Sequence, residues 1–518
     1  MLPLYLIDVV RHLSDRSNFL LIPLIVSSIS RTFVMSLTND TEPNRSRRII
    51  IVGAGVFGLS TALHLAQRGY SNVHIYDYQP YHENSYACSA GCDAASCDEN
   101  KILRASYGDA KLYQDLAFKA MPEWRKWNEM LAQTSASELP PGLSPDVTLW
   151  NNCGFLRLSS DRLEESEEKT QQNFPDEMKH TQYRVPDESR RRDAEADGVP
   201  ASKIDPFSRF GRGLRTDGVL DMTAGFVLAS RACAFALHLV SKLGVHTYLG
   251  PEYGMKSLIR QENEVTGIVT NDGKEHPGDI VVVACGGWTP SLIPEIERLV
   301  ETTAGSVLSF RLLDDRQDLW DNYSPEVFPV WSWNMNSYRP DHEDIAGLYG
   351  MPRTPEGVLK VAFRGAKWTN YSSHSHVTGR PLSYPKTDVD EIPEEAMRVI
   401  KTFCKENLPD LLDLELERGR LCWYSDSVDN SFLIDYPPDI KNLIVANGGS
   451  GHGFKFLPVL GEHVVDVLER KDTEYTRLFR WRDVPDRDPN GLREGPDGWR
   501  TLVKQRMVGR EAWKAAKA

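Results

Sequence analysis

Cysteine is scarce in this chain, with eight residues among 518. That number is too small for a fold that disulfide bonds hold together. Cys88, Cys92 and Cys97 lie close in sequence, but they lack CxxC spacing and have no fourth soft ligand nearby. Such a group favours small thiols packed in a protein core over a metal centre. We therefore expect no metal site.

The sequence also lacks a hydrophobic run long enough to cross a bilayer, which takes about 20 residues. The apolar segment Phe19–Ile29 has 11 residues and no convincing small-residue cleavage site after it. Met35 opens a short polar leader that runs into the first expected strand. We expect Met35 to be the working start and residues 1–34 to be dispensable, with a weak membrane anchor in residues 1–34 as the alternative.

A positive net charge is missing as well, because 73 acidic residues outnumber 60 lysines and arginines and give a net charge of −13. This balance argues against nucleic acid or an anionic membrane as a partner. It leaves a small anionic substrate open, since a binding site can be locally basic. With 41% hydrophobic and 26% charged residues, the chain has the composition of a globular protein of two or three domains.

What the sequence does contain is a complete βαβ nucleotide-binding pattern over Arg48–Pro80. A β-branched run leads into the glycine motif Gly53–Gly58, and an amphipathic helix and a second strand follow, ending at Asp77. The three glycines of such a motif permit a tight turn, a close approach to a pyrophosphate and close helix packing. The helix N-terminus faces the anion, and the acid 19 residues later accepts from a ribose hydroxyl. The predicted nucleotide is FAD or NAD.

A second strand–turn–helix pattern lies near the C-terminus. The apolar run Leu443–Ala446 leads into the glycine-rich segment Gly448–Lys455, and we expect a helix over roughly Leu457–Glu469. This pattern predicts a second backbone site for an anion, with a lysine beside it. Two such elements suit a dinucleotide with a bulky redox ring better than NAD alone, so FAD is the favoured cofactor.

Three motifs carry a resemblance to a known family: ACGGWTP after a strand, CWYS, and GGSGHGFKFLP. The chain resembles the flavoprotein amine oxidases of the D-amino-acid-oxidase superfamily over about residues 48–470. Within that superfamily it is similar to the monomeric sarcosine oxidase branch, which includes the fungal fructosyl amino acid oxidases (amadoriases) and the saccharopine or pipecolate oxidases.

The resemblance implies an α/β fold, with a Rossmann-like FAD-binding domain and a mixed-sheet α+β substrate domain that are both discontinuous in sequence. The expected division is an extension outside the fold over residues 1–47, the FAD-binding domain over 48–110, 215–305 and 415–470, the substrate domain over 111–214 and 306–414, and a tail over 471–518.

The resemblance also assigns roles to individual residues. Cys422 occupies the position that bonds covalently to the flavin 8α-methyl group. Lys455 matches the lysine near the flavin pyrimidine edge that helps to hold the substrate carboxylate, and Arg104 matches the carboxylate-binding arginine. Lys101 stands where the family has another arginine, which changes the environment of the ring. Lys360 follows a Tyr-Gly-x-Pro turn and matches the oxygen-activating lysine.

The expected catalytic residues are therefore Lys360, Arg104 and Lys455. Those expected to bind the cofactor are Gly53, Gly55, Val56, Phe57, Gly58, Asp77, Lys101, Cys422, Gly449, Gly451, His452, Gly453, Phe454 and Lys455. His452 is expected to support the glycine turn by hydrogen bonding rather than to act as a base. Backbone N–H groups of the segment Gly451–Gly453 are expected to stabilise negative charge on the reduced flavin.

The function that follows is a FAD-dependent oxidase of a secondary amine or N-substituted amino acid, which forms an imine and hydrogen peroxide from O2. A biosynthetic oxidase whose imine is trapped by an internal nucleophile, and a flavin dehydrogenase with a non-oxygen acceptor, are the alternatives. A non-catalytic flavin protein would not need the Arg104 and Lys455 pair. The expected protein is a monomer or weak dimer in the cytoplasm or the peroxisome; its terminal Ala516-Lys517-Ala518 matches two positions of a Ser-Lys-Leu-like signal.

Overall fold

The computed structural model describes residues 43–372, 381–387, 389–483, 492 and 494–514. The expectations for residues 1–34, Met35 and the terminal tripeptide lie outside the described residues. Ser46–Ala518 form one compact unit. Within the described ranges, no helix combines the length and the apolar character that a membrane crossing requires.

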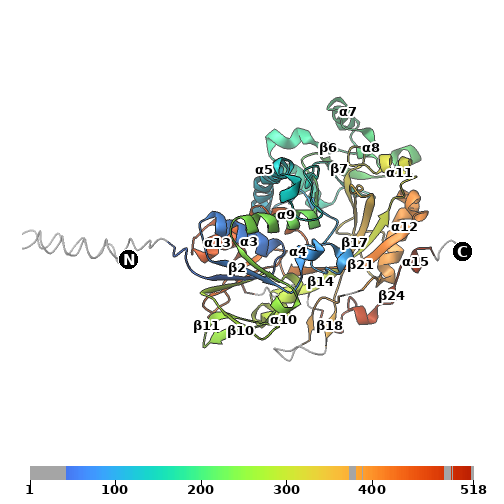
Figure 1. Cartoon of the computed structure of the whole chain (residues 1–518). Helices are drawn as coiled ribbons and strands as arrows, with labels where there is room; N and C mark the ends of the chain where they lie inside the picture. Colours follow the sequence, from blue (N-terminus) through green and yellow to red (C-terminus); the bar gives the residue numbers. More distant parts are fainter. Residues whose placement is uncertain (1–42, 373–380, 388, 484–491, 493, 515–518) are drawn as a thin grey trace, which may run out of the picture. The chain divides into compact units, whose positions relative to one another are not determined.

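A six-stranded sheet forms the nucleotide-binding half of this unit (Figure 1). Its strands pair in parallel except for the antiparallel pair β22–β23 at one edge. Continuous apolar runs such as IIIV in β1 are typical of parallel strands that are covered on both faces. The order is β22 (Leu433–Asp435), β23 (Leu443–Asn447), β13 (Ile280–Val283), β1 (Ile49–Val52), β2 (Val73–Asp77) and β9 (His246–Leu249).

The two faces of this sheet are covered by different elements. Ile49 and Ile51 point to one face and pack in a core with helices α3, α5, α9 and α13, whereas Ile50 and Val52 point to the other and pack with the β10–β12 sheet (Figure 1). This alternation is the two-residue period of a strand. The covering elements are α3 (Val56–Gln67), α5 (Lys111–Gln133), α9 (Ala229–Lys242), α13 (Leu460–Leu468), β10 (Met255–Gln261), β11 (Glu264–Thr270) and β12 (Glu275–Pro277).

An eight-stranded mixed sheet forms the other half, and only its β15–β5 pair is parallel among the pairings of the described residues. Helix α12 (Glu394–Asn407) packs on one face beside β17 (Figure 1). The order is β21 (Leu416–Ser427), β14 (Val300–Arg311), β17 (Val358–Trp368), β16 (Leu348–Met351), β15 (Val330–Trp333), β5 (Phe155–Ser159), β7 (Asp217–Asp221) and β6 (Gln182–Arg184).

Side chains alternate between the two faces of this sheet, so one face carries apolar groups and the other carries polar groups. Apolar side chains on alternate positions, such as Val361 and Phe363 of β17, pack in the α12 core, where each fully buried one contributes about 1.5–3 kcal/mol. The intervening positions carry polar groups toward the nucleotide-binding half. They include Arg157, Ser332, Tyr349, Lys360, Arg364, Arg420, Cys422 and Tyr424.

The remaining elements are short. The strands are β3 (Asn100–Leu103), β4 (Trp150–Asn151), β8 (Gly225–Leu228), β18 (Tyr371–Ser372), β19 (Leu382–Ser383), β20 (Ile392–Pro393) and β24 (Met507–Val508). The helices are α4 (Tyr81–Asn84), α6 (Glu165–Asn173), α7 (Glu188–Ala196), α8 (Ala201–Ile204), α10 (Thr289–Leu292), α11 (Gln317–Asn322), α14 (Glu474–Phe479) and α15 (Glu511–Lys514).

The mixed α/β fold expected from the sequence is confirmed, but some elements lie elsewhere than we expected. The sequence predicts one helix over Phe226–Leu243, whereas the structure has strand β8 before α9, because β8 pairs with both β3 and β4. Helix α5, expected in the substrate domain, packs in the same core as the nucleotide-binding sheet. Strand β21, expected in the FAD-binding domain, lies in the eight-stranded sheet. The division into two domains stays a prediction.

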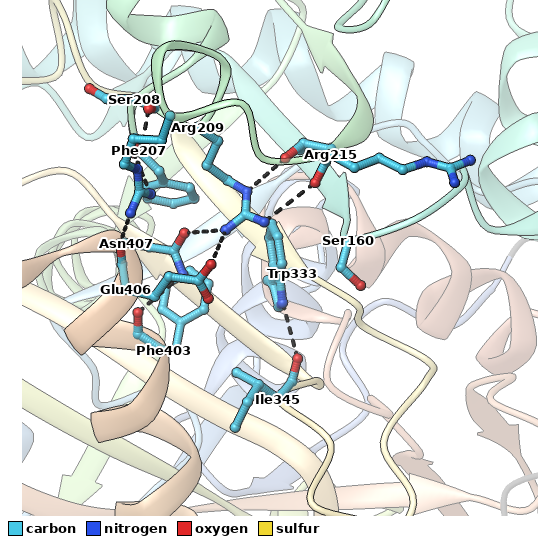
Figure 2. A network of polar contacts seen from close by, with 12 residues as sticks. Ser160, Phe207, Ser208, Arg209, Arg215, Trp333, Ile345, Phe403, Glu406 and Asn407 are labelled. Carbon is cyan, nitrogen blue, oxygen red and sulfur yellow. Dashed lines mark hydrogen bonds and ion pairs between the residues drawn. The ribbon is translucent and has the colours of Figure 1, made fainter.

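Arg209, a buried residue in the loop before β7, binds two residues of helix α12 (Figure 2). The Arg209 guanidinium donates to Asn407 Oδ1 at 2.7 Å and pairs with Glu406 at 3.0 Å, and it lies 4.6 Å from the ring centroid of Trp333. Its Nε donates to Thr216 at 2.7 Å. Because these contacts hold the Arg209 guanidinium between the loop, helix α12 and the eight-stranded sheet, we assign Arg209 a structural role.

Candidate active site

A cavity of about 1190 Å³ lies between the two sheets. Its wall combines the first glycine motif, strand β3, the inward face of the eight-stranded sheet and the second glycine turn, Gly449–Lys455. Pockets that bind drug-sized ligands have volumes of roughly 300–1,000 Å³. The space is therefore sufficient for a large cofactor together with a small substrate.

The first glycine motif has no room for side chains. Gly53 has a φ of +105°, and a Cβ atom there would lie 2.5 Å from the carbonyl oxygen of Ala284. A Cβ at Gly55 would lie 3.0 Å from Ser96 Oγ, and one at Gly58 would lie 1.8 Å from the oxygen of Gly53. These contacts require glycine at all three positions. Gly53, Gly55 and Val56 line the cavity, so a pyrophosphate there can approach the N-terminus of α3.

Asp77 ends strand β2 and lines the same end of the cavity. Its carboxylate accepts the N–H of Ala54 at 2.7 Å and the N–H of Gln79 at 2.9 Å. Burial raises the pKa of Asp77 to about 6, although these N–H groups oppose the shift. The ionised carboxylate retains lone pairs with which it could accept from a ribose hydroxyl.

The second glycine turn also lines the cavity. The N–H groups of His452 and Gly453 donate to the carbonyl oxygen of Gly449 at 2.8 and 3.0 Å, so both are already engaged inside the turn. Gly449 and Gly453 pack against the ring of Phe57. A Cβ atom at Gly449 would lie 3.3 Å from that ring, and one at Gly453 would lie 3.2 Å from it. The turn is therefore stacked on the first glycine motif, and this stacking brings the two predicted anion sites together.

His452 supports this turn. Its Nδ1 lies 3.0 Å from the Tyr107 hydroxyl, and its Nε2 lies 2.9 Å from the carbonyl oxygen of Asn430. Burial, with the positive charge of Lys455 second, lowers the pKa of His452 to about 3. The imidazole is thus neutral and held at both nitrogens.

Two cations face the cavity without a counter-ion. Lys455 Nζ donates to the Tyr107 hydroxyl and to the His452 carbonyl oxygen, both at 2.9 Å. The Arg104 guanidinium lies 4.7 Å from the centroid of the Tyr107 ring and donates to Ser106 Oγ at 3.3 Å. In the described part of the chain neither cation pairs with a carboxylate. Burial, followed by the charge of Arg104, lowers the pKa of Lys455 well below its usual value.

Behind the cavity wall lies a cluster of buried charges around Asp98. The Asp98 carboxylate lies 2.6 Å from Lys101 Nζ, 3.0 Å from Lys360 Nζ and 2.7 Å from Arg420 Nη2. Burial alone would raise the pKa of Asp98, but the three cations outweigh burial and lower it. Lys360 also donates to the carbonyl oxygen of Asn100. Burial lowers the pKa of Lys360 more than Asp98 raises it.

Cys422 belongs to this cluster as well. Its Sγ lies 3.5 Å from Lys101 Nζ. Burial would raise the pKa of the thiol, but the charges of Lys101 and Arg420 together lower it. Cys422 and Lys360 are each 1% exposed and lie behind the lining residues, whereas Lys101 reaches the cavity.

The structure thus brings most of the predicted site residues to one cavity, with Lys360 and Cys422 directly behind its wall. Sequence reasoning missed Asp98, although it lies three residues before Lys101. It also missed Tyr349 and Tyr424, whose hydroxyl oxygens lie 3.4 Å apart on the cavity wall, and Arg364. Among the described residues, no three His, Cys, Asp or Glu side chains are arranged to hold a metal ion.

Comparison with known proteins agrees with this geometry. L-saccharopine oxidase from Schizosaccharomyces pombe is 28% identical over 462 residues, covering 85% of this chain and 94% of that protein. Human peroxisomal sarcosine oxidase is 23% identical over 82% of this chain and 93% of its own. The crystal structure of amadoriase I from Aspergillus fumigatus is 25% identical, has a TM-score of 0.66, and covers 85% of this chain and 90% of that one.

These relatives are oxidases, and the family resemblance seen in the motifs is confirmed. The family model described as "FAD dependent oxidoreductase" matches residues 48–467, which is most of the chain. The chain therefore belongs to the DAO family of FAD-dependent oxidoreductases.

Proposed function

We propose that this protein is a FAD-dependent oxidase of a secondary amine or N-substituted amino acid. The observation that carries the proposal is the pair of basic side chains Arg104 and Lys455, which contact no carboxylate among the described residues and line the cavity that also holds both glycine motifs. A carboxylate is the anion that such a pair suits in an amino acid substrate. The products are an imine and hydrogen peroxide. The amine gives up two electrons and two protons, and O2 takes up the same number.

The residues present fit FAD. Gly53 and Gly55 line the cavity at the start of α3, and Asp77 supplies a buried acceptor at one end. We propose that the cofactor is held by Gly53, Gly55, Val56, Phe57, Gly58, Asp77, Lys101, Gly449, Gly451, His452, Gly453, Phe454 and Lys455. When bound, FAD supplies the chemistry of taking a hydride equivalent from the amine α-carbon and passing the electrons to O2.

The chain itself orients the substrate. The planar guanidinium of Arg104 can hold a carboxylate through two parallel hydrogen bonds, which fixes the neighbouring C–H. Burial raises the pKa of both Tyr349 and Tyr424, so these hydroxyls stay neutral and can bind the amine region without adding charge. His452 is not proposed as a base, because both of its nitrogens are engaged and its pKa is low.

We further propose a covalent link between Cys422 and the flavin. The support is the short distance between Cys422 Sγ and Lys101 Nζ and the lowered pKa of the thiol, since the thiolate is the nucleophilic form. Lys360 is proposed to assist oxygen reduction. It contributes to a cluster in which three cations share the single carboxylate of Asp98, so the wall behind the cavity carries an excess of positive charge.

A flavin dehydrogenase with another electron acceptor is the second candidate. The observation in its favour is that Lys360 pairs with Asp98 instead of reaching the cavity surface. The cytoplasm or peroxisome, and a monomer or weak dimer, stay our proposals for location and assembly. A human relative is named as peroxisomal.

The proposed function is tested by screening peroxide release over N-alkyl and N-fructosyl amino acids, with each free amine and each esterified amino acid as matched controls. We expect peroxide from at least one carboxylate-bearing secondary amine and much less from its ester. Flavin reduction without peroxide, followed by fast reduction of an artificial quinone, would favour the dehydrogenase. No flavin reduction by any secondary amine would contradict the proposal.

A further inference from the structure

An arginine near the C-terminus holds a loop of the cavity wall. Arg482 follows α14 and lies beyond the range that the family model matches. Its Nη2 donates to Asp429 Oδ1 at 2.6 Å and to the carbonyl oxygen of Ser431 at 2.9 Å, and its Nη1 donates to the carbonyl oxygen of Phe432 at 3.1 Å. One side chain thus binds three acceptors of loop 428–432, which connects β21 to β22.

Loop 428–432 contributes to the cavity wall, whereas Arg482 lies behind that wall. Asp429, Asn430 and Ser431 line the cavity, and the first two are also exposed to solvent. A segment with so much exposed backbone opens locally at low cost unless hydrogen bonds hold it. The guanidinium carries its donors in a fixed plane, so a single arginine can hold several acceptors at once. Arg482 is therefore placed to fix the shape of this loop.

Hydrogen bonds lead from this loop to the cations of the cavity. The carbonyl oxygen of Asn430 lies 2.9 Å from Nε2 of the neutral His452, and this nitrogen is the donor, because a carbonyl oxygen only accepts. Nδ1 of His452 is then an acceptor, and the Tyr107 hydroxyl donates to it over 3.0 Å. The same hydroxyl accepts from Lys455 Nζ at 2.9 Å. The loop carbonyl thus fixes the tautomer of His452 and, through Tyr107, the contact of Lys455.

Aromatic packing around His452 does not fix this arrangement by itself. The ring of Phe432 stacks on the imidazole with 4.9 Å between centroids, and the ring of Tyr113 lies edge-on to it at the same distance. A half turn of the imidazole about its Cβ–Cγ bond would leave both ring contacts nearly unchanged. It would, however, replace both nitrogens by carbon atoms at their partners. The hydrogen bonds, and not the stacking, therefore set the orientation of the imidazole.

We propose that Arg482 is a positioning residue for the substrate carboxylate. It fixes the loop and, through His452 and Tyr107, sets the position of Lys455 Nζ. Arg104 depends on the same support, since its guanidinium lies 4.7 Å from the centroid of the Tyr107 ring. This inference rests on the proposed function, because it concerns the carboxylate that these two cations are proposed to bind.

The experiment measures carboxylate binding to the flavin-loaded protein without turnover. Acetate and its neutral analogue acetamide are titrated, and the flavin absorbance spectrum reports binding. Arg482→Met should weaken acetate binding about 10-fold, because part of the charge-assisted contact of Lys455 is lost. Acetamide binding should not change. Arg480→Met is the matched control, since it removes an exposed arginine two residues away, and it should leave both ligands unchanged.

A double variant shows whether Arg482 acts through the lysine. Lys455→Met removes that cation, and adding Arg482→Met to it should cause a far smaller further loss of acetate affinity, because coupled residues are not additive. Arg482→Lys keeps the charge beside Asp429 but lacks the planar fork. It should restore part of the acetate affinity, and it serves if Arg482→Met does not retain flavin.

Two results would overturn the inference. One is wild-type acetate affinity in flavin-loaded Arg482→Met, since a purely structural role would lower stability or flavin content and leave the affinity of the loaded protein unchanged. The other is the full further loss of affinity when Arg482→Met is added to Lys455→Met.

Turnover separates this inference from the proposed function. In the expected result, Arg482→Met raises KM for a carboxylate-bearing secondary amine, while kcat and the KM for its ester change little. If acetate binding depends on Arg482 but no secondary amine reduces the flavin, the positioning role stands and the proposed oxidase fails. If the wild type and Arg482→Met oxidise the amine with equal KM, the oxidase stands and the positioning role fails.

Discussion

Replacing Asp98 by asparagine should strongly destabilise the protein. The substitution keeps the size of the side chain but removes the one negative charge that three cations share, at 2.6, 2.7 and 3.0 Å. Lys360 and Arg420 are 1% and 5% exposed, so water cannot replace the lost partner. Removing one partner of a buried pair costs about 3–5 kcal/mol. Because the three pairs share one carboxylate, their losses do not add, and we expect at least about 4 kcal/mol in total.

The assay is urea unfolding of the flavin-loaded protein, followed by tryptophan fluorescence and by flavin absorbance. Asp318→Asn is the matched control, since its partner Arg316 is exposed and that ion pair lies on the surface; it should leave the midpoint unchanged. The double variant Asp98→Asn with Lys360→Met should recover part of the loss, because it removes one uncompensated buried cation. A midpoint for Asp98→Asn that matches the control would refute the claim that this cluster depends on a single anion.

Three further predictions concern the cofactor and the substrate carboxylate. Cys422→Ser should fold and bind yellow flavin that acid releases, whereas acid should leave the flavin on the wild type; acid-labile flavin in the wild type would contradict the covalent link. Arg104→Ala and Lys455→Ala should each raise KM for an acidic amine by an amount equivalent to about 1.5–3 kcal/mol, with little effect on its ester. Burial raises the pKa of Asp77 to about 6, and FAD should prefer the ionised form, so FAD affinity of the Cys422→Ser apoprotein should rise from pH 5 to pH 7. Asp77→Asn should remove that dependence, and fluorescence titration checks it.

Local patterns allowed the nucleotide-binding part of the site to be predicted from the sequence. The apolar run before Gly53 forms a buried strand. The glycines that follow belong to one short segment, and close contacts of the backbone in that segment fix their spacing. The same holds for the turn after β23. In both places the interacting atoms are close neighbours in the chain, so the sequence carries the information directly.

The charged groups behind the wall could not be found in this way. Asp98 and Lys360 are 262 residues apart, and their contact depends on how β17 and the segment just before β3 are placed, since β3 and β17 belong to different sheets. Arg364 shows the same limit, because its isolated position in a strand has no local signal. Its contacts are made with Tyr424 and Asp426 of β21 and with Gly451 of the second glycine turn, two segments that are distant from it in the sequence.

The helix expected over Phe226–Leu243 is present as α9, but its expected start was wrong for a related reason. Its first residues are apolar and fit either a helix or a buried strand, and periodicity cannot separate the two over so short a run. Pairing of β8 with β3 on one side and β4 on the other decides for the strand. That pairing also sets the position of Lys101, which faces Val227 across the ladder.

The most direct test of the account is a stopped-flow experiment on the wild type and on Lys360→Met. We expect a carboxylate-bearing secondary amine to bleach the flavin of both proteins without air. On mixing with air, the wild type should recover its colour and release one peroxide per flavin, while Lys360→Met should recover about 10²- to 10³-fold more slowly, as the loss of one preorganised charge implies. A wild type that no such amine bleaches, or that recovers its colour only with an artificial quinone, would contradict the amine oxidase proposed here.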